Sequence, residues 1–471
     1  MAEGAELGMV GLGVMGRNLL LNMADHGFAV AGYDLDQDKV KALADEGASA
    51  ASPVHTAGEA EAFVKLLRKP RVVMMLVPAG KAVDAVISSL EPLLEEGDLI
   101  IDGGNSHFTD TDRRAKALAE KGLNFFGMGV SGGESGARHG PSMMPGGPAD
   151  AYKRVKPLLE ACSAHVDDEP CVAHLGPGSA GHYVKMVHNG IEYGLMQLIA
   201  ESYDLMHRGA GVGNDRLAEI FGEWNTGDLA GFLVEITARI FKKDDPRTGK
   251  RMVEVILDVA RQKGTGMWTS QDAFTLGVPV PTIDMAVAMR NLSAFEAERH
   301  AAAEALGGPK PTYEGDVDQL VKQVGEALHA AMIVTYAQGM SQLSHASKHY
   351  AYDLDLEVVS RIWRGGCIIR AALLEEMRKA YQAKPGLTNL LLDPGLGTKV
   401  SDLQGSLRQV VQTASGIGIP APGFASALAY FDALRASHLP ANLVQAQRDF
   451  FGAHTYERVD DEGTFHTEWE D

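Results

Sequence analysis

The sequence predicts an α/β N-terminal domain with a doubly wound parallel sheet, followed by a large all-α domain and a C-terminal tail. Short apolar runs alternate with helical patterns over residues 7–178. After a break rich in small residues at 176–182, helical periodicity dominates to about residue 437. The last stretch is polar and aromatic with little period. We therefore predict domains at 1–178 and 179–437, and a tail at 438–471 that needs another surface to lie on.

Six apolar runs in the first domain predict buried strands, and they occupy residues 7–10, 29–34, 71–77, 98–102, 123–130 and 171–176. Amphipathic segments lie between several of these runs, which is typical of parallel strands joined by crossover helices. In the helical domain, the proline-punctuated segments GVPVPT and GIGIPAPG predict turns.

The composition is that of a globular protein, with 45% hydrophobic and 22% charged residues. The formal net charge of -19 argues against nucleic acid or an anionic membrane as a partner. An anionic substrate would require a local group of cations. Three cysteines without a CxxC pair fit a reducing compartment. Since we find neither a signal peptide nor an apolar run of roughly 18 residues, we expect a cytoplasmic protein.

A glycine motif follows the first predicted strand and opens a helical pattern; it consists of Gly11, Leu12, Gly13, Val14, Met15 and Gly16. In this context the motif predicts a dinucleotide-binding domain of the Rossmann type. Gly11 permits a tight turn, Gly13 lets backbone N–H groups reach a pyrophosphate, and Gly16 lets the helix pack closely on the strand. The alternative is a glycine turn in an unrelated α/β domain.

Asp34 stands at the end of the second predicted strand, about 20 residues into this unit. A carboxylate there accepts hydrogen bonds from the ribose 2′-hydroxyl of NAD and repels the 2′-phosphate of NADP. Asp36 adds a second negative charge, and no arginine stands beside the pair in the sequence. The loop therefore favours NAD, unless both carboxylates are simply solvated.

Four polar residues stand at positions i, i+3, i+4 and i+7 of a predicted helix: Lys185, His188, Asn189 and Glu192. At this spacing they share one face. A neighbouring apolar stripe would anchor the helix in the core; it comprises Val184, Val187, Ile191, Leu195 and Leu198. Partial burial would lower the pKa of Lys185, as a general base requires. The alternative is a Lys/Glu row on a solvated helix.

Two loops of small residues follow predicted strands, Gly103–Ser106 and Ser131–Gly133. Ligands bind at the carboxyl ends of parallel strands, so both loops are candidate binding sites, although each could be a plain turn. Two other patterns predict no site. His345 and His349 have no accompanying carboxylate ligand, so no metal is expected. The acidic run Asp167–Glu169 is expected to be solvated.

Long motifs over nearly the whole chain resemble those of the decarboxylating 6-phosphogluconate dehydrogenases; they include IIDGGNS, GVSGGESGARHGPSMMPGG, GHYVKMVHNGIEYG, WRGGCIIR and LVQAQRDFFGAHTYER. The resemblance implies oxidative decarboxylation of 6-phospho-D-gluconate to D-ribulose 5-phosphate and CO2, with reduction of NAD(P)+. It also implies a metal-independent homodimer whose tail reaches the neighbouring site.

The same resemblance assigns roles to individual residues. Lys185 would be the general base and Glu192 the general acid. The sugar acid would be held by Asn105, Ser131, Gly132, Gly133, His188, Asn189 and Tyr193. The phosphate and remaining polar groups would meet Lys263, Arg290, Arg448 and His454. Further cofactor contacts would come from Val77, Pro78, Ala79 and Asn105.

Three departures from the family pattern concern charge. Many members carry an Asn-Arg-Thr/Ser run where this chain has Asp34, Leu35 and Asp36. Pro78 also replaces a common lysine, and these two departures lead us to expect NAD to be preferred, with NADP possible. Met267 replaces another common lysine, without a predicted consequence. Two other functions stay open: a non-decarboxylating β-hydroxyacid dehydrogenase of the 3-hydroxyisobutyrate type, and a non-catalytic nucleotide sensor.

Overall fold

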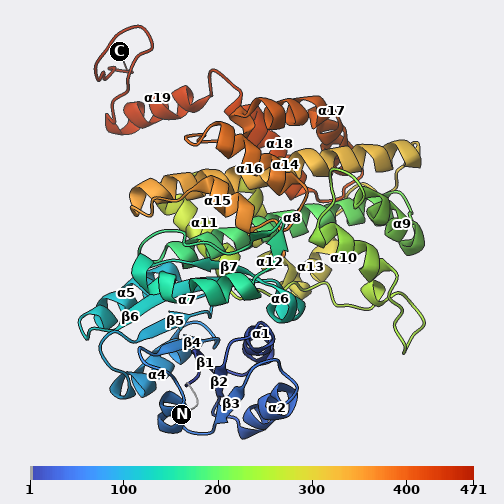
Figure 1. Cartoon of the computed structure of the whole chain (residues 1–471). Helices are drawn as coiled ribbons and strands as arrows, with labels where there is room; N and C mark the ends of the chain where they lie inside the picture. Colours follow the sequence, from blue (N-terminus) through green and yellow to red (C-terminus); the bar gives the residue numbers. More distant parts are fainter. Residues whose placement is uncertain (1–3, 471) are drawn as a thin grey trace.

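The computed structural model describes residues 4–470, with a strand-and-helix domain at one end and a body of helices at the other (Figure 1). The sheet has the strand order β3-β2-β1-β4-β5-β6-β7. Its strands are β1 (Leu7–Val10), β2 (Val30–Tyr33), β3 (Val54–Ala57), β4 (Val72–Met75), β5 (Leu99–Asp102), β6 (Asn124–Ser131) and β7 (Ser142–Pro145). Neighbouring strands pair in parallel except β7, which is antiparallel to β6. The predicted doubly wound fold is confirmed.

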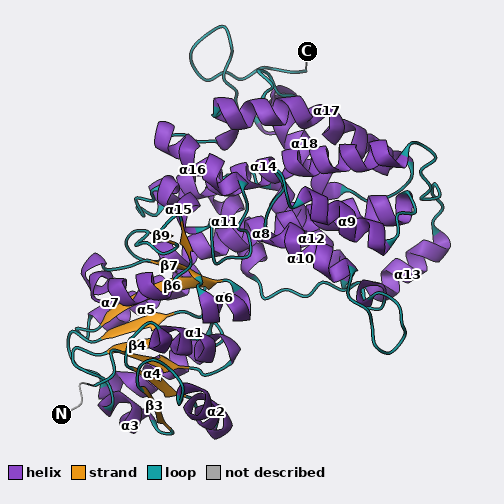
Figure 2. Cartoon of the chain, turned by 45° about the vertical axis from the view of Figure 1, so that its right-hand side comes forward, coloured by secondary structure: helices purple, strands orange, loops and turns teal. Residues whose placement is uncertain are grey.

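Alternate residues of the strands point to opposite faces of the sheet and pack into two separate hydrophobic cores. Met74 and Ile101 belong to one core, whereas Val73 and Ile100 belong to the other. Helices cover both faces (Figure 2). They are α1 (Val14–Asp25), α2 (Gln37–Gly47), α3 (Ala60–Lys65), α4 (Lys81–Leu90), α5 (Phe108–Ala119), α6 (Gly133–His139) and α7 (Ala149–Cys162). Because both faces are buried, the central strands read as continuous apolar runs.

The strand prediction is wrong at three places. The apolar pattern does not indicate β3, an edge strand that is mostly half-buried, or β7, which lies within the glycine- and proline-rich segment GPSMMPGG. Residues 171–176 are not a regular strand. Although Cys171 and Val172 are buried, this segment makes only an isolated bridge between Met143 and Val172 among the described residues. Its apolar character reflects burial beside β7 rather than membership of the sheet.

The second half of the chain is helical, as predicted. It contains α8 (Ala180–Asp204), α9 (Asn214–Trp224), α10 (Phe232–Phe241), α11 (Thr265–Leu276), α12 (Pro281–Ser293), α13 (Glu296–Ala305), α14 (Val317–His349), α15 (Leu356–Ile362), α16 (Leu373–Ala383), α17 (Pro394–Gly416), α18 (Pro422–Leu434) and α19 (Ala441–Gly452). The 33-residue α14 is about 50 Å long and is buried over most of its length. Within residues 4–470, none of the helices combines the length and apolarity needed to span a bilayer.

Helix α8 approaches the sheet closely because glycines line the contact. A Cβ atom at Gly127 would lie 2.5 Å from His182 Nδ1, and one at Gly129 would lie 2.3 Å from Lys185 Cβ. On the helix side, a Cβ at Gly181 would lie 2.2 Å from the Met144 carbonyl oxygen. No larger side chain fits between these backbones without movement. This contact places Lys185 beside the carboxyl end of β6.

A buried carboxylate fastens the other end of α8 to α18. Glu201 accepts hydrogen bonds from the backbone N–H groups of Gly423 (2.7 Å) and Phe424 (3.0 Å), which lie in the first turn of α18. A carboxylate is well placed there, because the first N–H groups of a helix have no partner within it. Burial nevertheless raises the pKa of Glu201 to about 7. The residue thus braces the helix that carries Lys185.

The tail is more regular than its sequence predicts, because residues 441–452 form the helix α19. This helix lies at the end of the helical body away from the sheet (Figure 1). Among the described residues of α19, the buried side chain is the polar one of Asp449. The apolar side chains of Leu443, Val444, Phe450 and Phe451 are exposed. Apolar side chains gathered on an uncovered helix indicate an interaction surface.

Candidate active site

The glycine motif forms the turn between β1 and α1. Gly11 has φ 92°, a conformation that favours glycine. A Cβ at Gly16 would lie 1.9 Å from the Gly11 carbonyl oxygen, so only glycine allows this helix–strand contact. At Gly13, the residue before α1, a Cβ would meet nothing within 4 Å, and no side chain caps the helix. The turn therefore leaves room and free N–H groups for an anion at the start of α1.

Asp34 is fixed toward the glycine turn. Its carboxylate accepts hydrogen bonds from the backbone N–H groups of Leu12 (2.7 Å) and Asp36 (3.0 Å). Lys39 Nζ lies 3.7 Å from Asp34 and 3.5 Å from Asp36. Leu35, where the family commonly has an arginine, is 84% exposed. The loop after β2 thus presents two carboxylates and an apolar side chain beside the turn.

The loops after β4, β5 and β6 lie along one edge of the sheet. Val77 is half-buried, and Pro78 and Ala79 are exposed, in the loop between β4 and α4. Asn105, with φ 54°, bonds through its side chain to the carbonyl (3.3 Å) and N–H (3.1 Å) of Val130. Because Val130 precedes Ser131, this contact joins the two loops that the sequence predicts as binding sites.

The polar row of α8 comes together as its spacing predicts. Lys185 Nζ lies 3.3 Å from His188 Nδ1 and donates a short hydrogen bond to Asn189 Oδ1. His188 Nδ1 lies 3.9 Å from the Glu192 carboxylate, and His188 Nε2 lies 3.3 Å from Ser131 Oγ. The row therefore runs from the loop after β6 along one face of α8. The apolar stripe of α8 is buried, as expected.

Burial dominates the electrostatics of this row. Lys185 is 4% exposed, and desolvation lowers its pKa although Glu192 nearby opposes the shift. Burial raises the pKa of Glu192 against the influence of Lys185 and Arg290. Burial and the adjacent ammonium of Lys185 lower the pKa of His188 well below its usual value. These directions favour a neutral lysine and a protonated carboxylic acid, which are the forms needed by a base and an acid.

Two of the four predicted cations lie on elements packed near the row. The Arg290 guanidinium lies 3.5 Å from the centre of the Tyr193 ring, one residue beyond Glu192. Lys263 is exposed and lies just before α11. Met267, which replaces a common lysine, packs in a small cluster with Tyr193, Ala286 and Val287. The methionine thus supports the tyrosine ring on which Arg290 lies.

The other two cations are not brought to the row within one chain. Arg448 bonds to Gln445, and the His454 ring packs against Phe451; both residues are exposed on the tail. In Figures 1 and 2 the tail extends from the outer end of the helical body, whereas α8 passes through the middle.

One contact of the polar row is not indicated by the sequence pattern: Thr265 on α11 accepts a hydrogen bond from Asn189 Nδ2 at 2.9 Å. This contact links segments 76 residues apart.

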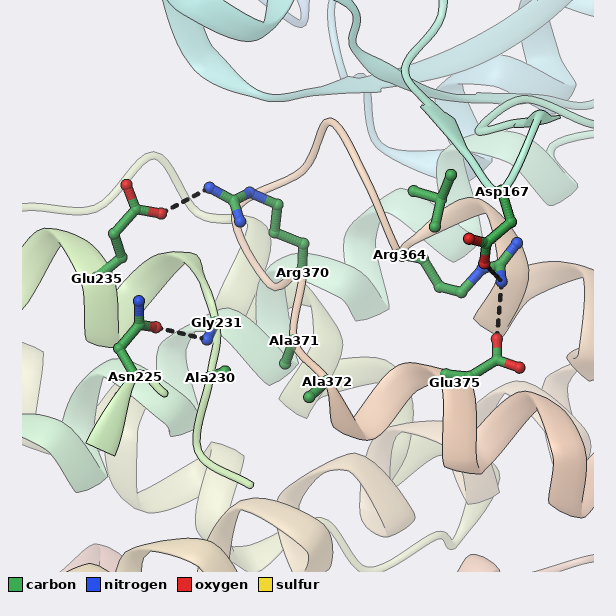
Figure 3. Close-up of a pocket in the computed structure, with 11 residues that line it drawn as sticks. Asp167, Asn225, Ala230, Gly231, Glu235, Arg364, Arg370, Ala371, Ala372 and Glu375 are labelled. Carbon is green, nitrogen blue, oxygen red and sulfur yellow. Dashed lines mark hydrogen bonds and ion pairs between the residues drawn. The ribbon is translucent and has the colours of Figure 1, made fainter. Parts of the chain in front are cut away.

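A cavity of about 390 Å³ lies where the hairpin β8 (His165–Val166) and β9 (Glu169–Pro170) meets the helical body (Figure 3). Its charged side chains are paired with one another. Arg364 lies 3.5 Å from Asp167 and 2.7 Å from Glu375, and Arg370 lies 2.9 Å from Glu235. Asp167 and Asp168 of the acidic run are exposed, as predicted, and Asp167 and Glu169 also pair with the buried Arg364. Arg364 thereby joins the two halves of the chain, whereas its pair with Glu375 and the Arg370–Glu235 pair lie within the helical half.

Comparison with known proteins covers both halves. The family model described as "NAD binding domain of 6-phosphogluconate dehydrogenase" matches residues 6–176. The model described as "6-phosphogluconate dehydrogenase, C-terminal domain" matches residues 181–469.

Several relatives match over nearly their full length. The NADP(+)-dependent, decarboxylating 6-phosphogluconate dehydrogenase of Bacillus subtilis is 52% identical, over 98% of this chain and 99% of that one. A decarboxylating enzyme of Synechocystis is 50% identical, over 98% and 97%. The solved 6-phosphogluconate dehydrogenase of Plasmodium falciparum, described with NADP+ and 6-phosphogluconate, matches with a TM-score of 0.94, 43% identity, and coverage of 98% and 100%. The chain belongs to the 6-phosphogluconate dehydrogenase family.

Proposed function

We propose that the chain oxidatively decarboxylates 6-phospho-D-gluconate to D-ribulose 5-phosphate and CO2, reducing a nicotinamide dinucleotide. The observation that carries this proposal is the buried row of Lys185, His188, Asn189 and Glu192 beside Ser131. The row lies next to a sheet with a dinucleotide-binding turn, in a chain that belongs to this family. Retention of both Lys185 and Glu192 argues against a non-catalytic sensor.

In this proposal Lys185 removes the proton from the C3 hydroxyl of the substrate. Burial lowers the pKa of Lys185, which favours the neutral amine that a general base requires. The nicotinamide supplies the hydride acceptor. Oxidation at C3 produces a β-keto acid, which loses CO2. Glu192, whose pKa is raised by burial, then donates a proton to C1 of the enediol.

The same geometry supports the remaining substrate contacts. Asn105, Ser131, Gly132 and Gly133 present polar and small groups at the ends of β5 and β6, and they would hold the carboxylate and hydroxyls with His188, Asn189 and Tyr193. Lys263 and Arg290 would bind the phosphate from the same subunit. Since the chain carries a net charge of -19, a dianionic substrate needs such a local group of cations.

The cofactor would bind across the glycine turn and the loops after β2 and β4. Its pyrophosphate fits the start of α1, where Gly13 has open space. The residues that would contact it are Gly11, Leu12, Gly13, Val14, Met15, Gly16, Asp34, Leu35, Asp36, Val77, Pro78, Ala79 and Asn105.

We propose that this chain prefers NAD, in contrast to the relatives described with NADP. The two backbone hydrogen bonds to Asp34 keep its carboxylate beside the glycine turn, where it would meet the ribose 2′-hydroxyl. Lys39 is shared between two carboxylates, and Arg17 is paired with Glu46 at 3.2 Å. A 2′-phosphate would therefore have to displace existing ion pairs to find a cation.

We also propose a homodimer in which Arg448 and His454 complete the site of the neighbouring subunit. Their exposure and the uncovered apolar residues of α19 support this arrangement. In such a dimer, residues 1–178 bind the dinucleotide, residues 179–437 carry the substrate site and the dimer contact, and residues 438–471 reach the partner. The break between β9 and α8, and that between α18 and α19, support these boundaries.

We expect the purified chain to release CO2 and reduced cofactor in equal amounts from 6-phosphogluconate without added metal. A coupled measurement of CO2 and of absorbance from the reduced nicotinamide tests this reaction. Reduced cofactor without CO2 would instead indicate a non-decarboxylating β-hydroxyacid dehydrogenase. Loss of activity on chelation, restored by a divalent ion, would contradict metal-independent catalysis.

Replacing the acid and the base should stop different parts of the reaction. Lys185→Met should abolish hydride transfer because no base remains. Glu192→Gln should lower kcat by roughly 10²–10⁴-fold, the usual effect of losing a positioned acid. In steady-state assays, the alkaline decline of kcat that Glu192 ionisation causes should disappear in Glu192→Gln. Glu219→Gln, which changes an exposed glutamate of α9, is the control and should leave kcat unchanged. Wild-type rates in both site variants would refute the assignment.

We expect kcat/KM to be about 10²-fold higher with NAD than with NADP. The reason is that one unpaired charge in the NADP complex would cost a few kcal/mol. Asp34→Asn combined with Leu35→Arg should shift this ratio toward NADP by removing one carboxylate and adding a cation. Asp38→Asn, which changes an exposed carboxylate in the first turn of α2 just after this loop, is the control and should leave the ratio unchanged. A wild-type preference for NADP would show that Asp34 does not determine the choice.

A shared site can be tested by pairing two inactive subunits. If the tail acts in the neighbouring site, a heterodimer of Lys185→Met and Arg448→Ala subunits has one fully intact site. Its activity should be about half that of the wild type, because a two-fold dimer has two equivalent sites. The heterodimer can be isolated from coexpressed, differently tagged subunits. Arg458→Ala, which changes another arginine of the tail, is the control. An inactive heterodimer would mean that Arg448 acts within its own chain.

A further inference from the structure

Arg114 of α5 is a buried arginine that joins two loops of the sheet. Its side chain is 2% exposed, whereas that of the adjacent Arg113 is 57% exposed. The Arg114 guanidinium donates to the Gly80 carbonyl oxygen at 3.1 Å and to the Asp84 carboxylate at 2.8 Å. These two acceptors lie at the start of α4, directly after the loop that contains Pro78 and Ala79.

The other side of the same guanidinium contacts the loop after β5. It donates to Ser106 Oγ at 3.2 Å and to the buried Asp102 carboxylate at 3.5 Å. Asp102 in turn accepts from Ser106 Oγ (2.7 Å) and from the Gly104 N–H (2.9 Å). Asn105 lies between these residues. Arg114 therefore spans two loops that are far apart in sequence, and its planar fork of donors suits that geometry.

Helix α5 is also fastened to the helix that carries Lys185. Thr111 Oγ1 lies 2.7 Å from His182 Nδ1, and Ser179 Oγ donates to the Asp112 carboxylate at 2.8 Å. Ser179 and His182 lie at the start of α8. One short helix thus contacts the loop after β4, the loop after β5 and the start of α8.

We infer that Arg114 is a positioning residue that sets the spacing between the loop at 77–80 and the loop at 103–106. This inference rests on the proposed function, in which the first loop contacts the cofactor and Asn105 contacts both ligands. In a doubly wound sheet of this order, the glycine turn and Asp34 bind the adenosine half of the dinucleotide. The loops after β4 and β5 therefore face the nicotinamide half. Arg114 sets the position of the nicotinamide relative to the sugar acid and has little influence on the adenosine half.

The test compares Arg114→Lys with Arg113→Lys. A lysine keeps the charge but cannot reach four acceptors in two loops. In Arg114→Lys the dissociation constant of NADH should rise about tenfold or more, while that of ADP, which occupies only the adenosine half, should stay within about twofold. The kcat with 6-phosphogluconate should fall on the order of 10²-fold, because small misplacements of reacting groups are costly. Arg113→Lys, which alters an exposed partner of the same Asp84, should leave these values unchanged.

Ser106→Ala provides a second variant that removes only the contact on the Asn105 side. It should weaken NADH binding and lower kcat in the same direction but by less, with ADP binding retained. Equal weakening of ADP and NADH in both variants would mean that Arg114 merely stabilises the domain, and unchanged NADH binding and kcat would overturn the inference. The binding measurements do not need 6-phosphogluconate. An inactive wild type would therefore refute the proposed function while the NADH-to-ADP comparison still tests the role of Arg114.

Discussion

The close contact between α8 and the sheet is the constraint on which the rest of the site depends. Gly127 and Gly129 of β6 meet His182 and Lys185 of α8 at distances that no Cβ atom would allow. A lysine held there loses most of its hydration, and its pKa falls for that reason. The same contact brings Ser131 to His188. Close packing at the glycines therefore determines both the position of Lys185 and the direction of its pKa shift.

Burying the Lys185 amino group is costly unless neighbouring polar groups bond to it. Lys185 is bonded to His188 and Asn189, and Asn189 is bonded in turn to Thr265 of α11. Glu192 lies near enough to influence the lysine pKa, yet its own pKa is raised by burial. Burial thus favours the neutral form of both side chains, which are the forms that the proposed reaction uses. Glu201 and the α18 N-terminus hold the far end of this helix in place.

The sequence predicts the parts of this arrangement that follow from local periodicity. The polar row and the buried stripe of α8 need only helical spacing, and the glycine turn needs only the strand before it and the helix after it. Contacts between distant segments leave no such pattern. The bond from Asn189 to Thr265 and the contacts of Arg114 with Gly80 and Ser106 depend on how helices pack. The strands β3 and β7 were missed because one is a half-buried edge and the other lies among prolines and glycines.

The position of the tail follows from the same balance of charge and burial. Because the chain has a net charge of -19, binding a dianionic substrate requires several cationic side chains at the site. Four cations buried together in one chain would, however, repel one another and lose much of their hydration. Lys263 and Arg290 lie near the row, and the Arg290 charge lies over the Tyr193 ring. Arg448 is exposed on α19, whose apolar residues are uncovered, and His454 is exposed just after this helix. In the dimer proposed above, half of the cations come from the second subunit, so that folding of one chain does not have to bury all four charges.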